Sequence, residues 1–98
     1  MVAAARCLER AFGIGKRRLG ADHLSLAAIL VNLAGVNSKK GAHDEAAAAL
    51  GRALAISEAR LGVRHVDTQD IATELWNVKE TQGGREAEMD ALDAKYGI

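Results

Sequence analysis

The chain of 98 residues carries 13 basic and 13 acidic side chains, so its formal net charge at pH 7 is zero, and 49% of its residues are hydrophobic. A phosphate backbone selects a clearly basic protein face, so this balance argues against nucleic acid as a partner. No apolar run reaches the length of a membrane span, and we therefore expect one small, water-soluble domain without membrane insertion.

The hydrophobic periodicity is helical throughout, without an alternating strand pattern and without proline. It predicts five helices. The first covers about residues 2–18, and Gly20 is placed to end it in a left-handed conformation. Gly13 and Gly15 weaken this helix by up to about 1 kcal/mol each relative to alanine. Its core positions are expected at Cys7 or Leu8, Ala11, Phe12 and Leu19.

The second helix is expected from Leu24 or Ser25 to just before Gly41, with Asp22, His23 or Ser25 available as caps for its free amide protons. Its buried stripe is predicted to be Leu26, Ile29, Leu30, Leu33 and Val36. The third helix is expected from His43 or Asp44 to Arg60, with Gly62 as its stop. Its inward residues are predicted to be Ala46, Ala49, Leu50, Ala53, Leu54 and Ile56, where the alanines allow close helix approach.

The fourth helix is expected over about residues 66–82, before Gly83 and Gly84. It should bury Ile71, Ala72, Leu75 and Val78. The fifth is expected over about residues 85–96, with acidic residues favourably placed near its N-terminus.

An internal repeat organises these helices. The pentapeptide Leu-Gly-Ala-Asp-His at residues 19–23 returns as Leu-Gly-Val-Arg-His at residues 61–65, which gives a period of 42 residues. At this shift 17 of 56 compared positions are identical, where composition alone would give roughly five. The repeat includes the first eighteen residues, so it favours a structural helix over the alternative of an organelle transit peptide. It also aligns Cys7 with Ala49, which predicts a small buried side chain.

The chain resembles a tetratricopeptide-repeat array of the 42-residue, kinesin-light-chain-like kind. The resemblance rests on Leu-Val-Asn-Leu-Ala at 30–34, Gly-Ala-His-Asp-Glu-Ala at 41–46, Arg-Ala-Leu-Ala-Ile at 52–56 and the Leu-Gly-x-x-His loops. It implies an all-α fold, a short α-solenoid of antiparallel helix pairs in a right-handed superhelical stack. Residues 1–98 would form a single domain, divided into the second helix of a partial repeat (1–20), one full repeat (21–62) and a slightly truncated repeat (63–98).

The sequence departs from this family pattern at several positions. Leu24 and Val66 stand where the family has proline, and Asn37 and Lys79 where it has an aromatic residue. The last helix fits two registers. Without a deletion, Glu88 matches buried Ala46; with one residue deleted in the turn, Ala87 does, and the cost of burying a carboxylate favours the deletion.

The family uses the concave side of such a stack, lined by the first helix of each pair, to hold extended peptides. The resemblance and the buried stripes place Ala28, Val31, Gly35 and Ser38 of one helix and Asp70, Thr73, Asn77 and Glu80 of the next in this groove. Asn32 keeps one of the asparagine positions that hold the peptide backbone in the family, or alternatively faces solvent or a turn. Lys39 alone is poor support for a clamp on a C-terminal carboxylate.

Two functions remain, both in protein–protein interaction. The first and favoured one is a scaffold or docking subunit held in a larger complex through its helix faces, because about three repeats are normally needed to bury a continuous core. Its docking face is expected on the first helix, at Leu8, Phe12 and Ile14. The alternative is an adaptor that binds a short extended peptide in the groove. A homo-oligomer or a larger assembly is compatible with either function.

An enzyme is not expected, since the sequence contains no nucleophile elbow and no phosphate loop after a strand. His23, His43 and His65 lack metal-ligand spacing and are predicted to form hydrogen bonds in the loops. We therefore expect no catalytic residue, no metal and no cofactor. The single cysteine favours a reducing compartment such as the cytoplasm and leaves an organelle open.

Overall fold

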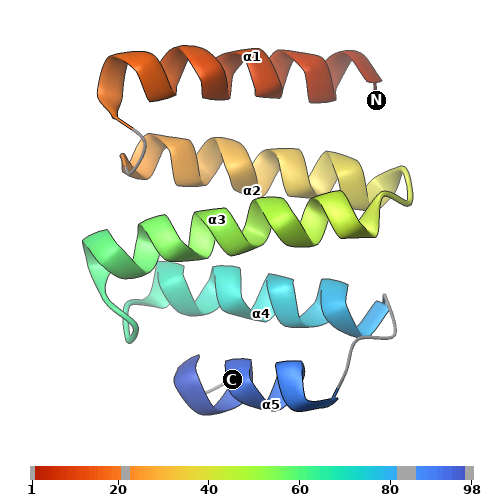
Figure 1. The fold of residues 1–98 in the computed structure, drawn as a ribbon, viewed down its shortest axis with the longest axis vertical. Coiled ribbons are helices and arrows are strands. Elements are labelled where there is room, and N and C mark those ends of the chain that lie inside the picture. The colour runs from red at the N-terminus through yellow and green to blue at the C-terminus, as the bar shows by residue number, and fades with distance from the viewer. Residues whose placement is uncertain (1, 21–22, 82–85, 97–98) are drawn as a thin grey trace.

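The computed structural model describes residues 2–20, 23–81 and 86–96, and for residues 2–5 and 86–88 it describes the backbone alone. The helices are α1 (Val2–Leu19), α2 (Leu24–Lys39), α3 (His43–Leu61), α4 (Val66–Thr81) and α5 (Glu86–Tyr96). They lie side by side in chain order, each antiparallel to the one before it (Figure 1). The stack measures 35 × 30 × 16 Å. The predicted all-α stack of helix pairs is confirmed.

The helix boundaries also agree with the predictions to within two residues wherever the structure describes them. The predicted ends at Gln82 and Arg85 and the stop at Gly83–Gly84 lie outside the described residues, as does the candidate cap Asp22. Gly20, Gly41 and Gly62 close the first three helices with φ of 94°, 82° and 93°, which side chains with a Cβ rarely adopt. The glycine stops read from the sequence are therefore confirmed at these three turns.

Two histidines one repeat apart cap the helices that follow them. His23 Nδ1 accepts a hydrogen bond from the Ser25 amide at 3.1 Å, and His65 Nδ1 accepts one from the Asp67 amide at 3.1 Å. Each bond satisfies an amide proton that a helix N-terminus leaves free. The prediction that these histidines form loop hydrogen bonds is confirmed. Nδ1 of the third histidine, His43, is buried and finds no partner among the described residues.

The core lies mainly between α2, α3 and α4. All six inward residues predicted for α3 are buried, and Ile71, Ala72 and Leu75 of α4 are buried beside the half-buried Val78. In α2 the prediction was only partly correct. Leu26 and Leu30 are buried as expected, but Ile29, Leu33 and Val36 are half-buried, and Ala27, Ala34 and Asn37 are buried instead. α2 has helices on both sides, so its buried surface is wider than one apolar stripe and includes small residues that allow close approach.

The predictions for α1 need correction at two positions. Leu8, Ala11 and Phe12 are half-buried, but Cys7 is exposed and Leu19 is 47% exposed. The alignment of Cys7 with Ala49 suggested burial, yet Ala49 belongs to a helix packed between α2 and α4, whereas α1 packs chiefly on α2. Equivalent positions of a repeat are equally buried only when both helices have the same neighbours.

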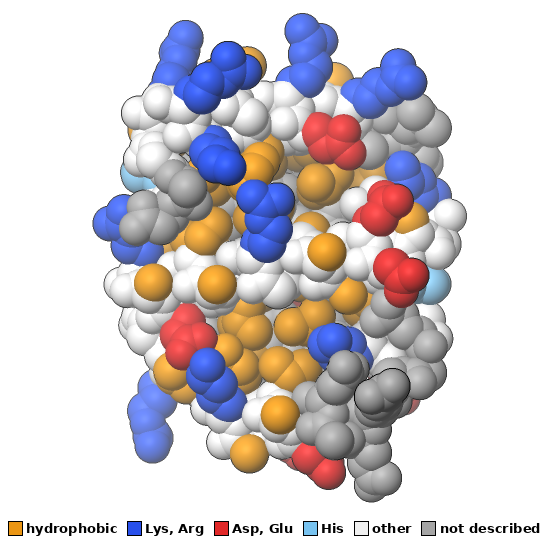
Figure 2. Space-filling view, viewed as in Figure 1, with side chains coloured by type: hydrophobic (Ala, Val, Ile, Leu, Met, Phe, Trp, Pro, Cys, Tyr) orange, Lys and Arg blue, Asp and Glu red, His pale blue; other side chains and the backbone are white. Residues whose placement is uncertain are grey.

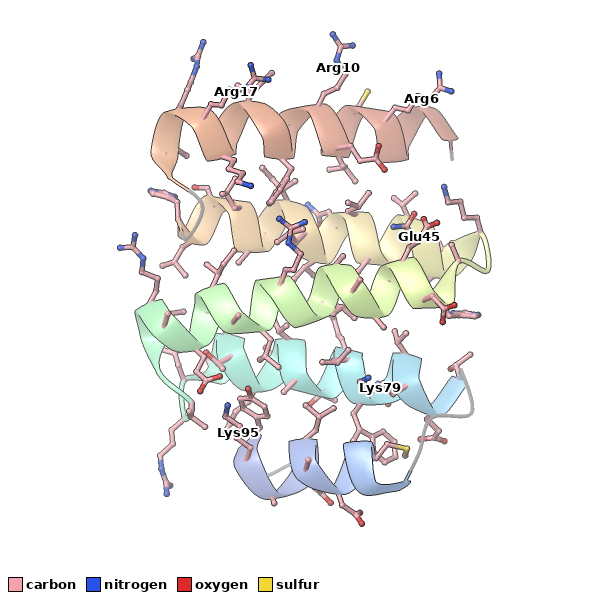
Figure 3. The ribbon with its side chains drawn as sticks, in the orientation of Figure 1. Arg6, Arg10, Arg17, Glu45, Lys79 and Lys95 are labelled. Carbon is pink, nitrogen blue, oxygen red and sulfur yellow. The ribbon has the colours of Figure 1, made fainter. Side chains whose placement is uncertain are left out.

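The C-terminal end of α5 is tied back to α3. Tyr96 is buried, and its hydroxyl donates a hydrogen bond to Oε2 of Glu58 at 2.8 Å. Lys95 Nζ lies 3.1 Å from Oε1 of the same carboxylate (Figure 3). The hydrogen bonds from Tyr96 and Lys95 lower the pKa of Glu58, and burial raises the pKa of Tyr96. We call Glu58, Lys95 and Tyr96 the α5 clasp.

The register of α5 is described only in part. The side chains of Ala87 and Glu88, which distinguish the two predicted registers, lie outside the described residues. Leu92 packs against the core and Tyr96 is buried in it, and they match Leu50 and Leu54 at a shift of 42 residues. Ala91 and Ala94, which a one-residue deletion would align with buried Leu50 and Ala53, face solvent. At these positions α5 therefore follows the register without a deletion, and the favoured deletion is wrong.

The two glycines of α1 differ in their surroundings, which gives a matched pair of variants. A Cβ at Gly13 would meet no atom within 4 Å, whereas a Cβ at Gly15 would lie 2.7 Å from Cδ2 of the fully buried Leu26. We expect Gly13→Ala to raise the free energy of unfolding by up to about 1 kcal/mol, through helix propensity. Gly15→Ala should gain less or lose stability, because Leu26 must move. Urea denaturation followed by circular dichroism checks both; equal gains would contradict this account of the α1–α2 contact.

Candidate functional site

An open groove runs between α2 and α4. It consists of two adjoining hollows of about 460 Å³ and 610 Å³, and the two share Val31, Asn32 and Glu74 as lining residues. The shared residues lie on both helices, so they join the hollows into one surface, which we call the α2–α4 groove. The groove follows α2, and this helix of 16 residues is about 24 Å long.

Most residues that the sequence placed on this surface line it. Those of the first hollow are Ala28, Val31, Asn32 and Asp70, and those of the second are Val31, Asn32, Gly35, Ser38 and Asn77. Thr73 instead lines a separate small hollow with Trp76, Asn77 and Asp93. Glu80 is exposed and lines none of these hollows.

Several lining residues were not among the predicted groove residues. Leu24, Ala27, Ser57, Leu61, His65, Asp67, Ile71 and Glu74 complete the first hollow, and Leu8, Ala34, Val36, Lys39, Leu50 and Val78 line the second. The sequence offered a signal for Glu74, which is the repeat equivalent of Asn32. It offered none for Leu8 or for the α3 residues, because their part in the groove depends on how neighbouring helices are rotated.

The first hollow is acidic. Asp67, Asp70 and Glu74 of α4 all line it, and among its lining residues neither lysine nor arginine occurs. Partial burial raises the pKa of Glu74, and the negative charge of Asp70 adds to that effect. Lys39, the one cation of the second hollow, lies at the end of α2. A ligand with a positive charge opposite α4 would therefore meet favourable electrostatics.

Asn32 is accessible from the groove. It is exposed on α2 and lines both hollows, across the groove from Glu74. A primary amide offers a donor and an acceptor, which matches the two polar groups of a peptide backbone. The floor beside it includes buried Ala27, Ile71 and Ser57, and the Ser57 hydroxyl is 2.8 Å from the buried Thr68 hydroxyl.

The predicted docking residues of α1 do not share one face. Leu8 lines the second hollow, and Phe12 packs against the core with the Arg52 guanidinium 4.6 Å above its ring. Ile14 is 50% exposed and lies about 200° around the helix from Phe12. The side of α1 that carries Ile14 is therefore the open one, and the side that carries Phe12 is covered.

The described part of the chain contains no group of three or more histidine, cysteine or acidic residues that could hold a metal ion. Within the same part, no helix is both long and apolar enough to cross a membrane.

The match to a family model agrees with the helical fold. The family model described as "Tetratricopeptide repeat" matches residues 1–59, which extend from α1 almost to the end of α3. Among curated proteins, none matches the chain.

Proposed function

The chain belongs to the tetratricopeptide repeat family, whose repeats generally mediate protein–protein interactions, and on this basis we propose that it binds an extended peptide in the α2–α4 groove. The main support for this proposal is that the two hollows are continuous, since they share Val31, Asn32 and Glu74 as lining residues. A surface of this kind, concave and largely apolar with a few convergent polar groups, is the usual form of a binding site. We expect no catalytic activity.

The groove favours a peptide with basic side chains. Asp67, Asp70 and Glu74 follow one side of the first hollow, so a lysine or arginine of the ligand would be paired there. At about 3.3 Å per residue, roughly seven extended residues match the length of α2. Asn32 would hold the backbone of this segment, as asparagine does in the kinesin-light-chain-like subtype that the sequence resembles.

The test is a titration with two synthetic peptides that differ only in charge, followed by calorimetry. One alternates lysine with valine and the other alternates glutamate with valine over about eight residues, enough to fill the groove. We expect the lysine peptide to bind and the glutamate peptide not to bind. Glu74→Lys should weaken binding of the lysine peptide by at least about tenfold, because it places a like charge in the groove. Asn32→Ala should weaken it by about fivefold through loss of one hydrogen bond.

Glu80→Lys is the matched control for this titration. It makes the same charge change on the same helix, at an exposed position outside the hollows, and should leave the affinity nearly unchanged. Equal binding of both peptides, or equal effects of the Glu74 and Glu80 variants, would contradict the proposal. Circular dichroism of each variant verifies that the fold is retained.

A second candidate function is a docking subunit held in a larger complex through its helix faces. It is favoured by one observation, the open side of α1, where Ile14 is 50% exposed. A contiguous apolar patch is typical of interaction sites, and Ile14 lies in one row with the exposed Cys7. The two functions use different surfaces and are compatible in one protein.

A further inference from the structure

The open side of α1 has the character of a helix-packing surface. Cys7 and Ile14 are exposed there, yet the residues one repeat later, Ala49 and Ile56, are buried in α3. Residues seven apart lie on the same side of a helix, so Cys7 and Ile14 form one row. In the described part of the chain, no helix covers this row.

Basic residues surround this row. α1 carries five basic residues and one acidic residue. Arg6, Arg10 and Arg17 are spaced four and seven residues apart, and their side chains point away from the rest of the stack (Figure 3). Figure 2 shows lysine and arginine side chains gathered at this end of the molecule. We call Arg6, Cys7, Arg10, Ile14 and Arg17 the arginine face.

The opposite end of the stack has the opposite charge. α4 and α5 together carry eight acidic residues and two basic ones. On α5, Asp90, Ala91, Asp93 and Ala94 are exposed, whereas Leu92 and Tyr96 pack in the core. Alanine side chains let another helix approach closely, so Ala91 and Ala94 offer a small-residue surface next to two carboxylates. Asp90 lies beside these alanines, and Asp93 lies at their border, where it also lines the small hollow with Thr73 and Trp76. We call Asp90, Ala91, Asp93 and Ala94 the acidic face.

We propose that the arginine face docks on the acidic face of a second copy of this chain. The two faces have complementary charge, and each pairs an apolar or small-residue surface with ionic groups. Contact between two arginine faces, or between two acidic faces, would place like charges against each other. The zero net charge of the chain therefore conceals two oppositely charged ends, since α1 carries five basic residues against one acidic and α5 carries four acidic residues against one basic.

The contact is head to tail, because the two faces lie at opposite ends of the stack (Figure 1). When two copies dock in this way, the resulting pair still has one free arginine face and one free acidic face. Such heterologous contacts can continue beyond two copies unless the rotation between copies closes a ring. The expected species are therefore a concentration-dependent series of oligomers rather than a single dimer.

The test measures mass by light scattering and sedimentation over a range of concentrations of the whole chain. We expect association at about 0.02 M salt and at least about tenfold weaker association at about 0.5 M, where exposed charges are screened within a few ångströms. A chain that stays monomeric at low salt up to its highest soluble concentration would overturn the proposal. That result is the one expected if another protein, or another segment, covers the arginine face.

Charge reversal identifies the faces. Arg10→Glu with Arg17→Glu, and separately Asp90→Lys with Asp93→Lys, should each weaken association at least about tenfold, and an equimolar mixture of the two variants should recover it. All four residues are exposed, so the fold should be retained. Lys40→Glu reverses a charge in the middle of the stack and should leave association unchanged. Unaltered association of either double variant, or a mixture that stays monomeric, would overturn the proposal.

Discussion

Leu26→Ala is expected to lower the free energy of unfolding by about 2–5 kcal/mol, the usual cost of removing a fully buried leucine side chain and leaving a cavity. Leu26 is 0% exposed and lies in the first turn of α2. Its side chain packs against Gly15 of α1, where the absence of a Cβ leaves room for it. Its loss would therefore weaken both the core and the contact between α1 and α2. Native proteins are usually stable by only about 5–15 kcal/mol, so a loss of this size is a large fraction of the total.

The matched control for Leu26→Ala is Leu24→Ala. Leu24 begins the same helix but is 38% exposed, so the variant should cost no more than about 1 kcal/mol. Urea denaturation of both variants, with equal slopes against denaturant, gives the comparison. Equal losses at the two positions would mean that the tight α1–α2 contact contributes little to the stability of the protein.

Tyr96→Ala is expected to release α5 from the stack, at a cost of about 3–5 kcal/mol in the stability of that helix. The ring is buried, its hydroxyl donates to Glu58, and its main-chain carbonyl oxygen accepts a hydrogen bond from Gln69 Nε2 at 3.3 Å. α5 packs mainly on α4, and its described contacts there are fewer than those between the central helices. Amide hydrogen exchange should show loss of protection in α5 while α2 and α3 stay protected.

The variant Tyr96→Phe distinguishes the contribution of the buried ring from that of the hydrogen bond to Glu58, because it removes only the hydroxyl. It keeps the packing and leaves the part-exposed Glu58 with Lys95, so the expected loss is only about 1 kcal/mol. An equal loss in the alanine and phenylalanine variants would mean that the hydroxyl, and not the buried ring, holds α5.

The clasp also gives the stability a defined pH dependence. The pKa of Glu58 is lowered in the folded protein, so its contribution is present above the unfolded pKa and is lost as the pH falls through the folded pKa. The pKa of Tyr96 is raised, so its contribution is present below the unfolded pKa and is lost as the pH rises through the folded pKa. The pKa of Lys95 is also raised, first by its hydrogen bond to Glu58, so Lys95 loses its contribution on the alkaline side as well. Tyr96→Phe should therefore reduce both the alkaline and the acid loss and leave the part that the Lys95–Glu58 pair contributes, which unfolding measured across pH would reveal.

The helices and their turns could be predicted because their causes are local. Gly20 and Gly62 adopt positive φ, and His23 and His65 cap the next helix, so the repeated loop specifies its own conformation. The inward residues of α3 were predicted correctly because they recur at helical spacings of three and four residues, so the sequence pattern alone identifies the buried side. The division into a partial repeat, one full repeat and one slightly truncated repeat stays a prediction.

The exposed surfaces were harder to predict because they depend on neighbours. Cys7 and Ala49 are equivalent in sequence, but only Ala49 has a helix on its side. Leu8 and Phe12 were assigned to an open docking face, whereas the structure turns them toward the groove and the core. A 42-residue period shows which positions correspond in sequence. It does not show which sides of each helix are covered by a neighbouring helix.

The thickness of the stack, 16 Å between its two broad surfaces, has a mechanical consequence. A stack of this thickness has room for only one layer of core side chains. Leu50 and Ala34 of this layer border the α2–α4 groove, while Leu30 and Ala49 border a shallow hollow beside Arg52 on the other side of α2. Among the described residues, side chains of one core thus reach both broad surfaces, so a molecule bound at either surface would contact the leucines that support both.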